Sequence, residues 1–110
     1  MGADKKLVRL KFRNSCYKRD KYKCAKCDFQ STPEQAEKEL DAHHITDRNL
    51  MPNGGYVKEN GISLCESCHE KAEQFHSTGV PYPGYSIEEL YVVIGSNLEK
   101  AMEASRKLKI

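Results

Sequence analysis

Two Cys-x-x-Cys motifs, Cys24–Cys27 and Cys65–Cys68, restrict the possible folds of this chain more than any other feature. Each motif places two thiols on one side of a tight turn, and together they supply the four ligands of a tetrahedral zinc ion. Two pairs with identical spacing rarely arise by chance in a chain of 110 residues. Because four protein ligands leave no position for water, we predict a structural zinc site that joins the N-terminal part of the chain to the segment after Cys65.

Disulfide bonds and redox chemistry are the alternative uses of these cysteines. The chain has five cysteines, and an odd count with two regular pairs favours a metal site in a reducing compartment. A redox Cys-x-x-Cys motif would need a thioredoxin-like βαβ context, which the sequence does not have. For the fifth cysteine, Cys16, we expect a small buried residue on a helix rather than a ligand or a nucleophile.

Length and hydrophobicity indicate a single domain, residues 1–110. No apolar run approaches the roughly 18 residues that a membrane-spanning helix needs. No apolar segment follows the charged N-terminus, as one would in a signal peptide. We therefore expect a cytoplasmic, intracellular protein without a membrane partner.

The charge of the chain is unevenly distributed. Residues 1–26 contain ten Lys or Arg and two Asp, a net charge of +8, whereas residues 27–110 have a net charge of −6. A concentrated basic segment suits a polyanion such as DNA, although a solvated helix face is the alternative explanation. The candidate contacts to a DNA backbone are Lys11, Arg13, Lys18, Arg19, Lys21 and Lys23.

The N-terminal part of the chain has the pattern of a helix followed by a turn. Apolar residues on one face and basic residues on the other predict a helix over about residues 7–20. Residues 7–27 would then form a basic helix and the first zinc knuckle. Thr32-Pro33-Glu34-Gln35 resembles a helix start, which favours a short helix over 33–38 or, alternatively, a polar loop.

Residues 40–76 have the order strand, loop, strand, helix. The expected elements are a strand over 40–45, a loop over 47–60 with turn residues at 52–55, a strand over 61–65 and a helix over 66–75. Acidic residues near the start of that helix suit its dipole. This order is that of a ββα unit.

The C-terminal region, residues 86–108, is predicted to form one long helix after a Pro- and Gly-rich linker over 80–85. Ser86 and Glu89 form a capping box at its start, and Gly95 is the place where it would bend. Its apolar stripe, with steps of three and four residues, would cover the core of the domain. A dimer seam is the alternative, but a stripe containing Ala and Ser suits that poorly, so we expect a monomer rather than a dimer.

A second group of polar residues lies in the ββα unit. His43 and His44 end the first strand, and because strand neighbours point to opposite faces, both can serve one site only where the strand ends. His69 and Glu73 share one face of the following helix. We expect His43 and His69 to bind a divalent cation, with Glu73 as a third ligand or as an acceptor that orients one of them.

This group contains the chemistry of phosphodiester hydrolysis. A metal ion neutralises the developing negative charge, and a neutral histidine is a suitable general base for water. Taken singly, the residues have ordinary explanations: a structural histidine at His44, a turn residue at Asn60 and an exposed helix end at His76. Their occurrence together, in order and at compatible spacing, favours the functional interpretation.

The pattern resembles the HNH (His-Asn-His) endonucleases of the ββα-metal type with a four-cysteine zinc site. The resemblance covers roughly residues 13–76. It rests on three segments: Arg19-Asp20-Lys-Tyr-Lys-Cys24, Ala42-His43-His44-Ile45 and Asn60-Gly-Ile-Ser-Leu-Cys-Glu-Ser-Cys-His69. It implies an α+β fold with a small ββα-metal (His-Me finger) core and a structural zinc site, here flanked by an N-terminal helix and a long C-terminal helix.

The resemblance also implies an activity and a role for each residue. The expected activity is that of a metal-dependent DNA endonuclease or nicking enzyme with a one-metal mechanism. His44 would be the general base, and Asn60 a catalytic-site residue that orders the loop or contacts the metal. His43, where many family members have Asp, would bind Mg²⁺, Mn²⁺ or another divalent transition ion together with His69.

The resemblance has consequences for partners as well. So small a chain has little surface for reading bases, so sequence specificity would be low or come from a protein partner. Small free-standing proteins of this family are often encoded by phages or prophages. Two other functions remain as alternatives: a catalytically inactive zinc-stabilised nucleic-acid-binding module, and an interaction domain that dimerises through residues 87–108. The complete histidine and asparagine set argues against the inactive module.

Overall fold

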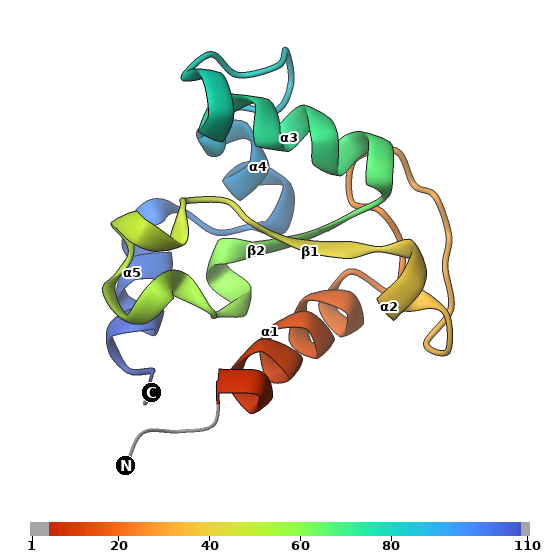
Figure 1. Ribbon diagram of the computed structural model, residues 1–110, viewed down its shortest axis with the longest axis horizontal. Helices are drawn as coiled ribbons and strands as arrows, with labels where there is room; N and C mark the ends of the chain where they lie inside the picture. Colours follow the sequence, from red (N-terminus) through yellow and green to blue (C-terminus); the bar gives the residue numbers. More distant parts are fainter. Residues whose placement is uncertain (1–4, 109–110) are drawn as a thin grey trace.

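The computed structural model describes residues 5–108 and has an α+β fold. Figure 1 shows two short strands between helices above and below them. The elements in chain order are α1 (Lys5–Arg19), α2 (Ala36–Glu39), β1 (Asp41–His44), the 3-10 turns η1 (Arg48–Leu50), η2 (Pro52–Gly55) and η3 (Lys58–Asn60), β2 (Gly61–Leu64), α3 (Glu66–Thr78), α4 (Ile87–Ile94) and α5 (Leu98–Arg106). The order β1, loop, β2, α3 confirms the predicted ββα unit.

The two strands form an antiparallel hairpin that lies in the middle of the fold. His43 pairs with Ile62 and His44 pairs with Gly61. Every residue of β2 is buried, because α1 packs against the hairpin from one side and α3 from the other, as Figure 1 shows. A short hairpin is marginal by itself, so this double cover is what keeps the register of its histidines.

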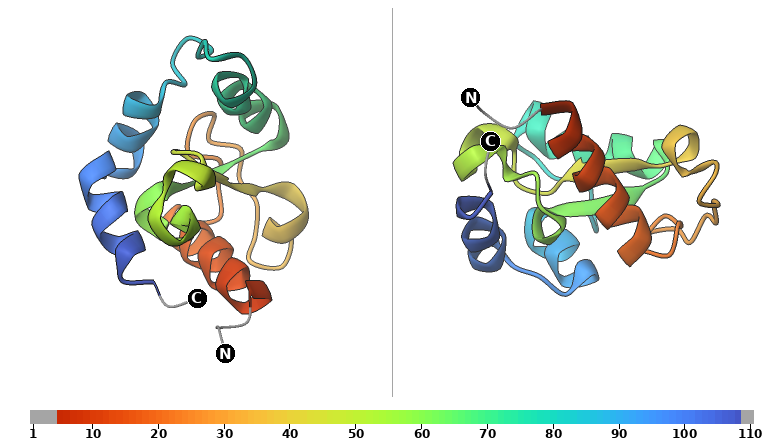
Figure 2. Two further views of the ribbon diagram at one scale, coloured as in Figure 1. Left: turned by 60° about the vertical axis from the view of Figure 1, so that its left-hand side comes forward. Right: turned by 90° about the horizontal axis from the view of Figure 1, so that it is seen from below.

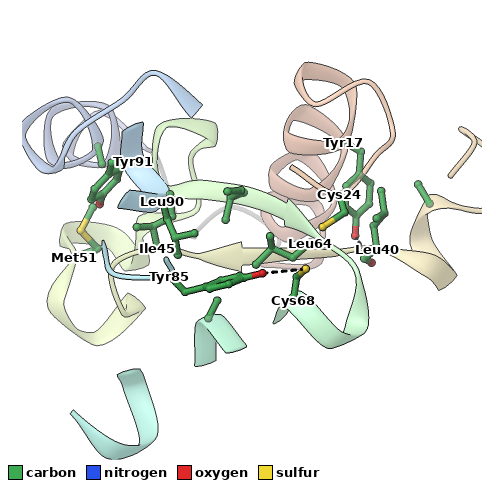
Figure 3. Close-up of a cluster of buried hydrophobic side chains, with 14 residues drawn as sticks. Tyr17, Cys24, Leu40, Ile45, Met51, Leu64, Cys68, Tyr85, Leu90 and Tyr91 are labelled. Atoms are coloured by element: carbon green, nitrogen blue, oxygen red, sulfur yellow. Dashed lines mark hydrogen bonds between the residues drawn. The ribbon is translucent and has the colours of Figure 1, made fainter. Parts of the chain in front are cut away.

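The hydrophobic core follows the hairpin from end to end. Figure 3 shows Tyr17, Cys24 and Leu40 at one end and Met51 and Tyr91 at the other. The Tyr17 hydroxyl, which is buried, donates to the backbone carbonyl of Leu40 at 2.9 Å. This hydrogen bond ties α1 to the residue that precedes β1, and so sets where the histidine strand begins.

The C-terminal region differs from the prediction of one long helix over 87–108. Gly95 ends α4 in the left-handed conformation, with φ 70°, and Asn97 caps α5 by accepting from the backbone N–H of Lys100 at 2.8 Å. The predicted capping box of Ser86 and Glu89 is present. The chain therefore turns sharply at Gly95, which glycine adopts without strain.

The turn at Gly95 brings α5 back onto the loop between the strands. The Ser105 hydroxyl, fully buried, accepts from the backbone N–H of Gly55 at 3.0 Å and donates to the carbonyl of Pro52. Ala101 on the same face is buried as well. The apolar stripe thus covers the chain's own core, as the sequence favoured.

Other boundaries shift by a few residues. The first helix starts two residues earlier than predicted and α3 continues to Thr78. The predicted helix over 33–38 is a turn followed by one helical turn, although the Thr32 hydroxyl does accept from the N–H of Gln35 at 3.1 Å. In the part of the chain that the structure describes, no helix has the length and apolar character needed to cross a membrane.

At Gly61 the side chains of α1 leave no room for a side chain on the hairpin. A Cβ atom at this position would lie 2.6 Å from Cε1 of Phe12 and closer still to the sulphur of Cys16. The backbone of Gly61 has φ −124°, which any residue adopts. The requirement for glycine is therefore one of space: a methyl group would push α1 away from the strand.

We expect Gly61→Ala to lower the free energy of unfolding by about 1–3 kcal/mol, the usual cost of overpacking a core. Urea unfolding of the zinc-loaded protein would measure it. Gly79→Ala is the comparison, because Gly79 has φ 80° but no neighbour within 4 Å of a new Cβ, so it reports backbone strain alone. An unchanged unfolding free energy for Gly61→Ala would contradict the close-packing argument.

Candidate functional site

The four paired cysteines converge on one point. The sulphurs of Cys24, Cys27, Cys65 and Cys68 all lie within 4.8 Å of one another. The sulphurs of Cys27 and Cys65 are 3.5 Å apart, close to the edge of about 3.8 Å that a tetrahedron with ordinary zinc–sulphur bonds would have. The donor set and its spacing therefore fit a closed zinc site.

The two Cys-x-x-Cys pairs lie on different parts of the fold. The first lies in the turn after α1, and the N–H of Ala25 donates to the carbonyl of Ser63 in β2 at 2.9 Å. Cys65 is the residue before α3 and Cys68 lies in its first turn. A metal ion held by all four sulphurs would join the end of β2, the start of α3 and the turn after α1.

Hydrogen-bond donors surround the sulphurs, as thiolates require. The buried Tyr85 hydroxyl donates to the sulphur of Cys68 at 3.2 Å, which Figure 3 shows as a dashed line. The backbone N–H of Phe29 donates to Cys27. The ammonium group of Lys26 lies 4.7 Å from the centre of the Tyr85 ring, which places a cation beside the cluster. These donors and this charge would stabilise anionic sulphur.

A second group of metal-binding side chains lies between β1 and α3. One donor atom each from His43, His69 and Glu73 falls within 4.8 Å of the others. The Oε1 atom of Glu73 is 3.2 Å from Nδ1 of His43 and 3.3 Å from Nε2 of His69. The structure thus brings together the two predicted ligands and places Glu73 with them.

The protonation of this group suits a divalent cation. Burial lowers the pKa of His43, which keeps its imidazole neutral. A hydrogen bond with His43 is the main cause that lowers the pKa of Glu73 to about 2, so its carboxylate is ionised. In the described part of the chain, the buried Nε2 atom of His43 has no hydrogen-bond partner. Two imidazoles and a carboxylate are a donor set that divalent transition ions accept.

Asp41 supports this group and was not anticipated from the sequence. Its Oδ2 atom lies 3.2 Å from Nδ1 of His69. A carboxylate on one imidazole nitrogen sets the tautomer and leaves the other nitrogen for a metal. The signal was in the sequence, because Asp41 and His43 are two residues apart on one strand and therefore point to the same face.

His44 leaves the strand on the face opposite to His43. Its ring stacks on Phe12 of α1, with centroids 4.6 Å apart, and meets the edge of Tyr56 at 4.8 Å. Burial is the main cause that lowers the pKa of His44 to about 4, so the imidazole is neutral near pH 7. Its Nε2 atom is buried and unpartnered among the described residues.

One cleft nevertheless adjoins both histidines, because β1 ends at His44. Its volume is about 400 Å³, and it is lined by Ala42, His43, His44, Asp47, Arg48, His69, Glu73 and His76. The expectation that the two histidines share a site at the strand end therefore agrees with the geometry. Asp47 and Arg48, just after the strand, are lining residues that the sequence did not single out.

His76 does not lie where the sequence suggested, at an exposed helix end. It is partly buried, and its Nε2 atom donates to the backbone carbonyl of His44 at 3.3 Å. Its ring centre lies 5.3 Å from that of His43. The shared helix face of His69, Glu73 and His76 was the sequence signal for this position.

Asn60 is a positioning residue and not a residue of the cleft. It is fully buried, and its Oδ1 atom accepts from the N–H of Thr46 at 3.0 Å and from the Tyr91 hydroxyl at 2.8 Å. Its amide group donates to the carbonyls of Thr46 and Gly55. All four hydrogen-bonding positions of the amide are used. This corrects the assignment as a catalytic residue and leaves the loop-ordering role.

The predicted DNA-backbone residues divide into three kinds. Arg19 donates to Asp20 and to the carbonyls of Lys58 and Gly61, so its guanidinium joins α1 to the hairpin instead of facing solvent. We therefore withdraw Arg19 as a backbone contact. Two residues pair weakly with acids, Arg13 with Glu37 at 4.0 Å and Lys23 with Asp28 at 3.7 Å. The side chains of Lys11, Lys18 and Lys21 are exposed.

Comparison with known families agrees with this geometry. Residues 24–75 match the family model described as HNH endonuclease. The match spans slightly less than half of the chain and includes both cysteine pairs and the second group of metal-binding side chains. It confirms the resemblance inferred from the sequence. Searches of curated proteins and of solved structures found no match.

We expect Cys65→Ser to lose the bound zinc and with it the cooperative thermal unfolding transition, because one of four thiolate ligands is removed. Zinc content by atomic absorption and a melt followed by circular dichroism would test this.

Cys16→Ser is the matched control. Cys16 is also fully buried but lies outside the cluster, so this variant should keep one zinc ion per chain and melt cooperatively at a lower temperature. Full zinc content and a cooperative melt in Cys65→Ser would contradict the structural role of the site.

Proposed function

We propose that this chain, whose residues 24–75 match the HNH endonuclease family, is a metal-dependent DNA endonuclease or nicking enzyme. The observation that carries the proposal is the meeting of His43, His69 and Glu73 in one cleft with His44. Metal donors and a neutral histidine base are the parts that hydrolysis of a phosphodiester needs. The cysteine cluster would hold structural zinc.

A divalent ion such as Mg²⁺, Mn²⁺ or another transition ion, bound by His43, His69 and Glu73, would neutralise charge on the scissile phosphate and on the leaving oxygen. Asp41 orients the His69 imidazole through its hydrogen bond with Nδ1. Because one Glu73 oxygen lies close to nitrogens of both histidines, this carboxylate also brings the two ligands together.

His44 is the proposed general base. Its low pKa keeps a lone pair available at neutral pH, and since Nε2 is buried, Nδ1 is the nitrogen left to take a proton from a water in the cleft. Phe12 and Tyr56 fix the plane of the ring from two sides. Asn60 holds the start of the following loop, and thereby the end of β1, through its hydrogen bonds to Thr46.

Supercoiled-plasmid cleavage tests the proposal. We expect nicking by wild type with Mg²⁺, Mn²⁺ or Ni²⁺ and none after chelation. We expect His44→Ala to lower the rate by about 10²–10⁴-fold, the usual contribution of a general base. His44→Gln is a second variant that keeps polarity and size without a base.

The controls separate chemistry from folding and from binding. Both His44 variants should melt cooperatively, retain structural zinc and still bind DNA in a gel-shift assay. If folded, zinc-loaded wild type binds DNA but does not cut it with any of the metals tested, the catalytically inactive binding module would be favoured. If wild type neither binds nor cuts DNA, both the nuclease and the DNA-binding module would be overturned.

A further inference from the structure

A basic pocket lies next to the metal-binding cleft and outside the predicted DNA-contact residues. Its volume is about 290 Å³, and it is lined by Lys5, Val8, Arg9, Arg48, Asn49, Asn53, Gly54 and Tyr56. The first three belong to the beginning of α1 and the others to the loop between the strands. Figure 1 shows that loop beside the first turns of α1, and Figure 2 gives two further views of the same region.

The charges of this pocket are all of one sign. Three of its lining residues are cations and none is a carboxylate. Within residues 5–108, no acidic side chain forms an ion pair with Lys5, Arg9 or Arg48. Elsewhere in the same region of the sequence the arginines are compensated: Arg13 meets Glu37 and Arg19 meets Asp20. Asp47 acts electrostatically on Arg48, but it lines the neighbouring cleft and not this pocket. Cations gathered around a hollow that no carboxylate lines favour an anionic ligand.

Tyr56 holds the two arginines together. Its hydroxyl lies 3.4 Å from Nη1 of Arg48 and is hydrogen-bonded to the Arg9 side chain as well. Burial opposes ionisation of the phenol, but these two guanidinium groups lower its pKa below the usual value. The arginines come from segments about 40 residues apart in the chain, so their convergence on one hydroxyl is a product of the fold.

The pocket adjoins the proposed reacting group. Arg48 lines both the pocket and the cleft that contains His43, His69 and Glu73. The Tyr56 ring that bridges the arginines also packs edge-on against His44 at 4.8 Å. An anion in the pocket would therefore lie beside the phosphate that the cleft would hold.

We propose that this pocket binds a second phosphodiester of the same DNA strand, next to the scissile one, through Arg9 and Arg48, with Lys5 at its edge. The inference rests on the proposed function. Guanidinium groups suit this ligand because they offer paired donors to phosphate oxygens. The pocket holds the strand in register with the cleft without reading bases, as backbone contacts do.

Salt-dependent DNA binding tests the proposal, with Arg9→Gln and Arg106→Gln as a matched pair. Both changes remove one arginine, but Arg106 lies in α5, pairs with Glu103 and lines neither the pocket nor the cleft. The substitutions are made in the His44→Ala background, so that binding of a duplex oligonucleotide can be measured by fluorescence anisotropy with metal present and without cleavage. Thermal melts confirm that each variant is folded.

We expect Arg9→Gln to reduce the slope of log affinity against log salt by about 1, since each phosphate contact on duplex DNA contributes about 0.9. Arg48→Gln should do the same, and Arg106→Gln should leave the slope unchanged. Equal slopes for Arg9→Gln and Arg106→Gln would overturn the proposed phosphate-binding pocket, even if wild type cuts plasmid DNA. Absence of both binding and cleavage in wild type would overturn the proposed function together with the pocket.

A phosphate in this pocket could also be the terminal phosphate of a DNA end. Duplexes with and without a 5′-phosphate separate the two sources. We expect both duplexes to bind with the same affinity and the same loss in Arg9→Gln, as an internal phosphodiester requires. A loss confined to the 5′-phosphorylated duplex would overturn the internal site.

Discussion

The convergence of four thiols on one point is the constraint on which the rest of the structure depends. Helix α3 carries His69, Glu73 and His76, and its start supplies the second cysteine pair, with Cys65 just before the helix and Cys68 in its first turn. A metal ion held by that cluster would fix the start of α3 against β2 and the turn after α1. Because His69 and Glu73 lie about one and two turns after that start, fixing it also fixes how far they lie from the histidines of β1. The proposed zinc site and the proposed reactive site thus share one helix, and zinc bound at the first would supply the rigidity that the second needs.

The parts of the fold that follow from local patterns could be predicted from the sequence. The ββα order, each Cys-x-x-Cys pair and the capping box at Ser86 depend on residues a few positions apart, so periodicity and spacing are sufficient. The meeting of the two cysteine pairs, 38 residues apart, was predicted from the four ligands that zinc needs. The grouping of His43 with His69 and Glu73 followed from a strand end and one helix face, and the family resemblance assigned the same two histidines to the metal. The long C-terminal helix was wrong because a single glycine in a good helical stripe does not reveal whether it bends or ends the helix. Only the packing of Ser105 against the interstrand loop decides that.

Residues whose roles depend on distant partners could not be assigned from the sequence. Asn60 has the position that the family pattern requires, yet its hydrogen bonds reach Tyr91 in α4, 31 residues away. Arg19 has the charge of a DNA contact, but carbonyls of the hairpin occupy its donors. Arg9 and Arg48 look like isolated surface cations until the fold places Tyr56 between them. In each case a contact between segments far apart in the chain decides the function of the side chain.

The buried polar atoms of the hairpin connect stability to function. In the described part of the chain, three buried side-chain atoms have no hydrogen-bond partner: Nε2 of His43, Nε2 of His44 and Oγ of Ser63. An unsatisfied buried polar group costs about 1–3 kcal/mol, a large fraction of the stability of a small domain. Two of the three belong to the histidines beside the cleft. A fold of this size tolerates such a cost where another source of stability is at hand. A metal ion bound by the cysteine cluster, which would join the end of β2, the start of α3 and the turn after α1, would be that source. The same argument explains why the proposed base and metal ligand on β1 lie on a covered strand. A mobile loop could not keep them desolvated and neutral, as both the proposed base and the proposed ligand must be.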